Sequence, residues 1–137
     1  MNSIELNWLS KSDRNILLPQ IIFTKIPACG LFLEPQKGEL LIGNKYYLMD
    51  RGIIEINPDY SIPAAIAHEW RHLWQFYNKK SNSVGSVWNP NSPLPYREHI
   101  RNFFNQDPSE YDALLFELSK YPTDTTREWY EWIIGNR

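Results

Sequence analysis

The chain contains one five-residue pattern that can bind and use a metal ion, H-E-x-x-H, which begins at His68, continues with Glu69 and ends at His72. Four residues advance an α-helix by about 400°, so the two imidazoles lie one turn apart on the same face and can both reach one ion. Glu69 lies about 100° around the helix, beside the ion and not bound to it, where a base can take a proton from a metal-bound water. The pattern therefore predicts a zinc site with His68 and His72 as ligands and Glu69 as the general base.

A zinc site of this kind needs a third protein ligand and an open position for water. The candidates downstream of the pattern are the remaining histidine and a group of carboxylates: His99, Asp107, Glu110, Asp112 and Glu117. On a helix over this segment Glu110 and Glu117 share one face, whereas Asp112 points about 200° away from Glu110. If Glu110 faces the ion, Asp112 cannot do so from the same helix, and the residues alone leave the choice of third ligand open.

Glu110 also has a purely structural interpretation. Residues 107–110 are typical of a helix start, with Asp107 as the N-cap, Pro108 at the first helical position and Glu110 at the third, where a capping-box carboxylate belongs. A carboxylate that caps its own helix is not free to bind an ion. Ligand and cap are therefore the two interpretations of Glu110.

Together the two motifs resemble those of the gluzincin metallopeptidases. H-E-x-x-H on one helix is followed by E-x-x-A at the start of a second, here Glu110-Tyr-Asp-Ala113, which is similar to the second motif of HtpX-type proteases. The resemblance implies His68, His72 and Glu110 as zinc ligands, and Glu69 as general base and acid in the hydrolysis of peptide bonds. It covers two motifs and not the whole chain, and Leu114 stands where that family has an acidic residue.

Two other zincin classes bear on the third ligand. The metzincin continuation requires Gly at position 75 and His at position 78, where this chain has Gln75 and Asn78, so that class is excluded. A third histidine after a loop, the position of His99, is seen in SprT-like zincins.

The motif must be carried by a long helix, which the sequence predicts over residues 62–80. Pro63 lies near its start, where proline is tolerated. The side that carries the histidines has small residues before them, which predicts an open front, and the opposite side has a bulky apolar stripe that predicts a buried back: Ile66, Trp70, Leu73, Trp74 and Tyr77.

Residues that begin, end or interrupt helices predict the remaining helices and loops. Further helices are predicted over residues 108–121 and 125–134, the latter ended by Gly135, with a short helix before residue 20. Residues 78–95 are rich in Asn, Ser and Pro and longer than a simple connector, so we expect a lid or an excursion over a binding surface.

Short apolar runs separated by Gly and Pro predict a meander of three to five strands over residues 20–57. The last run, residues 52–57, precedes the motif helix. Its alternation is typical of a strand with one face buried, and we expect an edge strand with which an extended substrate can pair.

Composition limits the classes of function that fit. With 137 residues the chain is predicted to form a single domain over residues 1–137, and a net charge of −2 without basic runs argues against nucleic acid as a partner. We expect no signal peptide, and the sequence has no stretch long and apolar enough to span a membrane. Cys29 is the single cysteine, so no internal disulfide can form, and we expect a cytoplasmic protein.

We therefore expect an α+β, zincin-like fold: a small, mostly antiparallel sheet packed on a central H-E-x-x-H helix, with further helices on the C-terminal side. The expected function is zinc-dependent hydrolysis of a peptide or protein substrate. The alternative is a non-catalytic, zincin-derived module that binds a protein partner. Candidates to stabilise the oxyanion of the reaction are Arg71, Tyr96, Arg97 and Tyr111.

Overall fold

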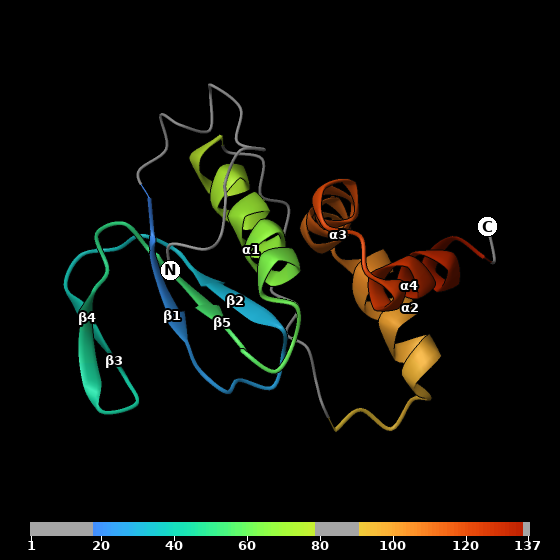
Figure 1. Cartoon of the computed structure of the whole chain (residues 1–137), viewed down its shortest axis with the longest axis horizontal. Helices are drawn as coiled ribbons and strands as arrows, with labels where there is room; N and C mark the ends of the chain where they lie inside the picture. The colour runs from blue at the N-terminus through green and yellow to red at the C-terminus, as the bar shows by residue number, and fades with distance from the viewer. Residues whose placement is uncertain (1–17, 79–90, 136–137) are drawn as a thin grey trace.

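The computed structural model describes residues 18–78 and 91–135, in which five strands precede four helices (Figure 1). The strands are β1 (Gln20–Phe23), β2 (Gly30–Leu33), β3 (Glu39–Ile42), β4 (Lys45–Leu48) and β5 (Ile53–Ile56). The helices are α1 (Ile62–Tyr77), α2 (Tyr96–Gln106), α3 (Pro108–Lys120) and α4 (Asp124–Ile134). The α+β class predicted from the sequence is confirmed. The short helix expected before residue 20, and residues 79–90 of the expected long loop, lie outside the described residues.

The strands form two sheets and not one meander. A three-stranded sheet has the order β1-β5-β2, and β3 pairs with β4 in a separate antiparallel hairpin. β5 runs parallel to β1 and antiparallel to β2, with Ile54 opposite both Ile21 and Phe32. The last strand thus inserts between the first two. A run of apolar residues that is buried on both faces favours such a central position.

The prediction that residues 52–57 form an edge strand is therefore wrong. All four residues of β5 are buried, including Glu55, whose carboxylate accepts a hydrogen bond from the Thr24 hydroxyl at 3.2 Å. Ile54 packs against Ile66 of α1, and Ile53 packs on the other face of the sheet. The edge strand that contacts α1 is β2.

Helix α1 lies between the three-stranded sheet and α3 (Figure 1). Pro63 is in its first turn, and the backbone N–H of Asn78 bonds back to the Trp74 carbonyl at its end. The predicted buried back is confirmed at Trp70 and Leu73. The predicted open front is not observed at the small residues, because Ala64 and Ala65 are also buried. The sheet and α3 cover α1 from two directions, so both helix faces are packed.

A second core joins the last three helices. Ile100 and Phe104 of α2 pack with Leu114 of α3 and Ile133 of α4. Helix α2 is not among the elements predicted from the sequence, because polar Arg, Asn and Gln residues surround its short apolar stripe. Leu114, which departs from the gluzincin pattern, is fully buried in this core. Burial of such a side chain stabilises the fold by about 1.5–3 kcal/mol, which explains an apolar residue at this position.

The predicted bounds of α3 and α4 agree with the observed ones to within a residue. Thr123 caps α4 through a reciprocal pair of hydrogen bonds with Thr126, and Gly135 follows its last residue. In the described part of the chain, no helix has the length and apolar character needed to cross a membrane.

Candidate metal centre

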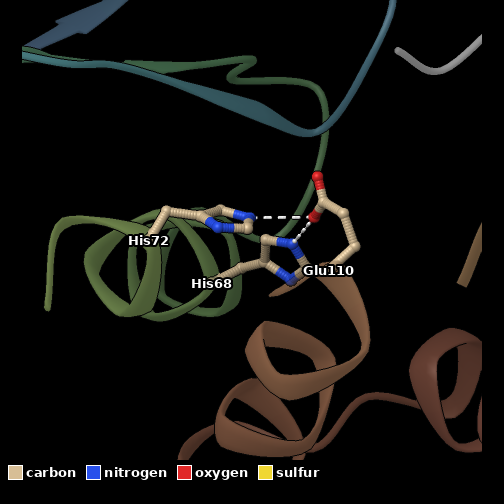
Figure 2. Close-up of side chains that lie close together, drawn as sticks. All are labelled: His68, His72 and Glu110. Atoms are coloured by element: carbon tan, nitrogen blue, oxygen red, sulfur yellow. Dashed lines mark hydrogen bonds and ion pairs between the residues drawn. The ribbon is translucent and has the colours of Figure 1, made fainter. Parts of the chain in front are cut away.

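The contact between α1 and α3 brings three potential metal ligands to one point. Nε2 of His68 lies 2.9 Å from Oε1 of Glu110, and Nε2 of His72 lies 2.8 Å from the same oxygen (Figure 2). The three ligand atoms all lie within 4.8 Å of one another. These are the residues that the gluzincin resemblance implies as zinc ligands.

The local structure explains why these side chains meet. One turn of α1 separates the two histidines, whose rings approach edge to face with centroids 5.2 Å apart. Glu110 lies in the first turn of α3, which Asp107 fixes by accepting hydrogen bonds from the backbone N–H groups of Ser109 at 3.1 Å and Glu110 at 3.3 Å. Asp107 is therefore the predicted N-cap, while the Glu110 carboxylate turns to the histidines.

Each imidazole makes a second contact through Nδ1. Nδ1 of His68 lies 3.0 Å from Oε1 of Glu117, and Nδ1 of His72 lies 3.0 Å from Oε1 of Gln75. Ionised carboxylate and amide oxygens accept and do not donate, so Nδ1 is the donor in both contacts. A neutral imidazole has a single N–H. Both Nε2 atoms are then left with lone pairs that face Glu110.

Oxygen acceptors thus surround all four ring nitrogens of the pair. Two Nε2 lone pairs cannot both face a carboxylate oxygen at 2.8–2.9 Å without a positive charge between them. Either additional protons on the rings or a metal ion can supply that charge. The two imidazoles and the carboxylate therefore converge where a proton or a metal ion can be bound.

The pKa values of these groups reflect the same demand for positive charge. Burial opposes protonation of His68, but hydrogen bonds with Glu110 and Glu117 outweigh it and raise the pKa of His68 well above 6.5. Burial and the bond with Glu110 act on His72 in the same opposing way, and its pKa is also raised. Burial disfavours the charge of Glu110, yet its bonds with both histidines hold the pKa of Glu110 far below its ordinary value.

Glu69, the predicted base, is nearly buried on α1, with 6% of its surface exposed. Burial raises the pKa of Glu69, and the neighbouring His68 and His72 partly counteract that rise. The start of β2 passes directly over this side chain. A Cβ atom added at Gly30 would lie 2.9 Å from Cγ and 3.0 Å from Oε2 of Glu69, closer than packed atoms allow. Gly30 thus provides the space in which the Glu69 carboxylate lies.

The alternative third ligand, His99, occupies a different place. It lies on α2 and is half-buried, and it does not belong to the group of converging ligand atoms found in the described residues.

Cys29 lies near the histidine-bearing side of α1. Burial and the charge of Glu117 raise the pKa of the Cys29 thiol to about 11, so the thiol is protonated at neutral pH.

Arg71 and Tyr96, two of the candidates for oxyanion stabilisation, make side-chain contacts with other residues of the helices. Arg71 donates from Nε to Asp112 at 2.8 Å and stacks on the Trp74 ring at 3.9 Å. The Tyr96 hydroxyl accepts a hydrogen bond from the Trp129 indole at 3.1 Å.

The other two candidates for oxyanion stabilisation lie where α2, α3 and α4 pack together. Arg97 lies 5.9 Å from the Trp132 ring, and Tyr111 packs on the core shared by α2, α3 and α4.

Sequence reasoning missed two residues of the site. Gln75 is expected on the same side of the helix as the histidines, three residues after His72, but the sequence assigns it no role there. No sequence pattern marks Gly30, because the space that it leaves for Glu69 depends on how β2 packs against α1.

Comparisons of the chain with protein-family models, with curated proteins and with solved structures give no significant match. Interpretation of the centre therefore depends on its geometry and chemistry.

Proposed function

We propose that this protein is a zinc-dependent metallopeptidase of the zincin type, in which His68, His72 and Glu110 hold the ion and Glu69 is the general base. One observation carries the proposal: two imidazole Nε2 atoms converge on a single carboxylate oxygen at 2.8–2.9 Å, while each Nδ1 atom lies 3.0 Å from a different side-chain oxygen.

The donor set fits zinc. Two histidines and one glutamate form a common ligand set of catalytic zinc and leave a fourth position open for water. Bonds of about 2.0–2.2 Å in a tetrahedron place ligand atoms about 3.4 Å apart. Each Nε2 atom would therefore lie about 0.5 Å farther from the Glu110 oxygen than it does now. Small changes in the side-chain torsion angles are enough for this movement.

The remaining chemistry comes from this chain's own residues. Zinc held by His68, His72 and Glu110 would lower the pKa of a bound water to about 7 and polarise a substrate carbonyl. Glu69 would act as the general base toward that water and as the general acid toward the leaving nitrogen. Burial favours this role, because a carboxyl group with a raised pKa holds the transferred proton more readily.

The strand beside Glu69 supports a peptide as the proposed substrate. β2 is an edge of the three-stranded sheet, and its first residue, Gly30, lies against Glu69. An extended peptide can add to such an edge through backbone hydrogen bonds, which would carry its carbonyls past Glu69. The substrate-binding edge is thus assigned to β2, in place of the strand predicted from the sequence.

The test combines metal content with hydrolysis. Purified wild-type protein should hold close to one zinc ion per chain and cleave an unfolded protein such as casein. Glu69→Gln should retain the zinc and lose at least about a hundredfold in rate, the usual scale for a lost general base. Folded wild-type protein that binds no added zinc would overturn the proposal. Zinc binding without hydrolysis would instead support the non-catalytic binding module.

A further inference from the structure

Both nitrogen and oxygen of the Gln75 side-chain amide have hydrogen-bond partners beside the candidate ligands. Its side chain is 1% exposed. Nε2 donates to the Ser109 carbonyl at 3.0 Å and to Oδ2 of Asp112 at 2.8 Å, while Oε1 lies 3.0 Å from Nδ1 of His72. A primary amide has two N–H groups, and both have acceptors here. The orientation of the amide is therefore fixed by α3, and its oxygen must face His72.

We infer that Gln75 is a positioning residue of the proposed zinc centre: it holds the His72 ring so that Nδ1 carries the proton and Nε2 faces the ion. The inference deepens the proposed function and rests on it. Partners of this kind, which bond to the second nitrogen of a metal-bound imidazole, typically change metal affinity by 10- to 100-fold when they are removed.

Asp112 contributes to the site through this amide. It cannot face the ion, because it points away from Glu110 on α3, but it accepts from Gln75 and is itself held by Arg71, whose Nε and Nη2 donate to it at 2.8 Å and 3.3 Å. The chain of contacts runs from Arg71 through Asp112 and Gln75 to His72. It crosses from α1 to α3 and back, and so couples the packing of the two helices to the orientation of one ligand.

The same contacts explain why an amide occupies position 75. A carboxylate there would face Oδ2 of Asp112 at 2.8 Å and could donate to neither Asp112 nor Ser109. His68, by contrast, is oriented by the carboxylate of Glu117. The structure thus assigns a neutral partner to one histidine and a charged partner to the other.

The experiment uses Gln75→Met, which keeps the length of the side chain and removes its hydrogen bonds. Zinc affinity should fall about tenfold or more in competition with a chelating indicator. Asp112→Asn should retain most of the affinity, because its amide oxygen can still accept from Gln75, whereas Asp112→Ala should lower it. Gln75→Glu should weaken zinc binding at least as much as Gln75→Met.

A matched control separates positioning from general stability. Thr123→Ala removes the N-cap of α4 and should destabilise the fold by an amount typical of a lost cap, with zinc affinity unchanged. Equal losses of zinc affinity in Thr123→Ala and Gln75→Met would overturn the inference. A zinc affinity of Gln75→Met equal to that of the wild type would also overturn the inference.

A second readout keeps this inference distinguishable from the proposed function. In zinc-free protein, at a pH high enough to leave the ring neutral, nitrogen NMR should show the proton of His72 on Nδ1 in wild type, and a shift toward Nε2 in Gln75→Met. An unchanged His72 signature would overturn the positioning role even if zinc binds. A wild type with the expected signature that binds no zinc would support the ring orientation and overturn the metal centre.

Discussion

Oε1 of Glu117 lies 3.0 Å from Nδ1 of His68, although the two residues are 49 positions apart in the chain. Glu117 follows Glu110 by about two turns of α3, so both carboxylates lie on the side of the helix that faces α1. They contact opposite nitrogens of the same imidazole. One face of α3 thus supplies both the candidate ligand and the acceptor that orients His68.

This relationship predicts the effect of Glu117→Leu. The His68 ring would lose the acceptor that keeps its proton on Nδ1, and zinc affinity should fall about 10- to 100-fold. Glu128→Leu, a change of the same kind at an exposed position of α4, is the control and should bind zinc like wild type. Titration with a competing chelator measures both variants, and equal affinities would contradict the assigned role of Glu117.

The third ligand can be tested by comparing Glu110→Gln with His99→Ala. Glu110→Gln removes the anionic oxygen that both histidines face, so zinc affinity should fall by about tenfold or more. His99→Ala should leave zinc content unchanged, because His99 lies on α2 outside the converging group. The zinc content of each variant after dialysis distinguishes Glu110 from His99 as the third ligand. Loss of zinc in His99→Ala alone would move the protein toward the three-histidine zincins.

Gly30→Ala tests the space around Glu69, the proposed general base. A methyl group at this position would lie 2.9 Å from Cγ of Glu69, so the carboxylate must shift. Because a misplaced base slows chemistry without touching the ligands, kcat should fall about tenfold or more while zinc content stays at one ion per chain. Gly43→Ala, which strains a turn of the β3-β4 hairpin at φ +64°, is the control and should cost stability without a change in kcat.

Leu114→Asp would introduce the acidic residue that gluzincins have at this position of their second motif, yet we expect it to unfold the protein partly or fully. Leu114 is fully buried among Ile100, Phe104 and Ile133, and a carboxylate there would lose apolar contacts and lack a partner for its charge. The expected loss is about 3–5 kcal/mol in the free energy of unfolding, measured by urea titration. A stable variant with tighter zinc binding would show that the family pattern applies here after all.

The stability of zinc-free protein should depend on pH in a defined direction. The pKa values of His68 and His72 are raised above 6.5 in the folded state, so the stability that they contribute is present below pH 6.5 and is lost as pH rises through their folded values. Zinc bound at the proposed site would replace the ring protons, and it should therefore increase Tm most at alkaline pH. Thermal unfolding with zinc or with EDTA between pH 6 and pH 9 measures this. Parallel curves would contradict cation binding by these rings.

The sequence by itself determined the features that depend on neighbouring residues. The spacing of His68, Glu69 and His72 specifies their places on a helix because the α-helical repeat is local. Asp107 and Pro108 likewise specify where α3 begins, since capping involves only the residues of the first turn.

Only the tertiary structure decided which distant groups reach the histidines. The sequence offered Glu110 as ligand or cap and His99 as an alternative, and the packing of α3 against α1 brings the Glu110 carboxylate to both rings. Glu117 and Gln75 take their roles from the same packing, and Gly30 takes its role from a strand order that places β2 at an edge. These relationships depend on contacts between segments far apart in the chain, whose energies come from burial and hydrogen bonding across elements and leave no periodic signal within any one of them.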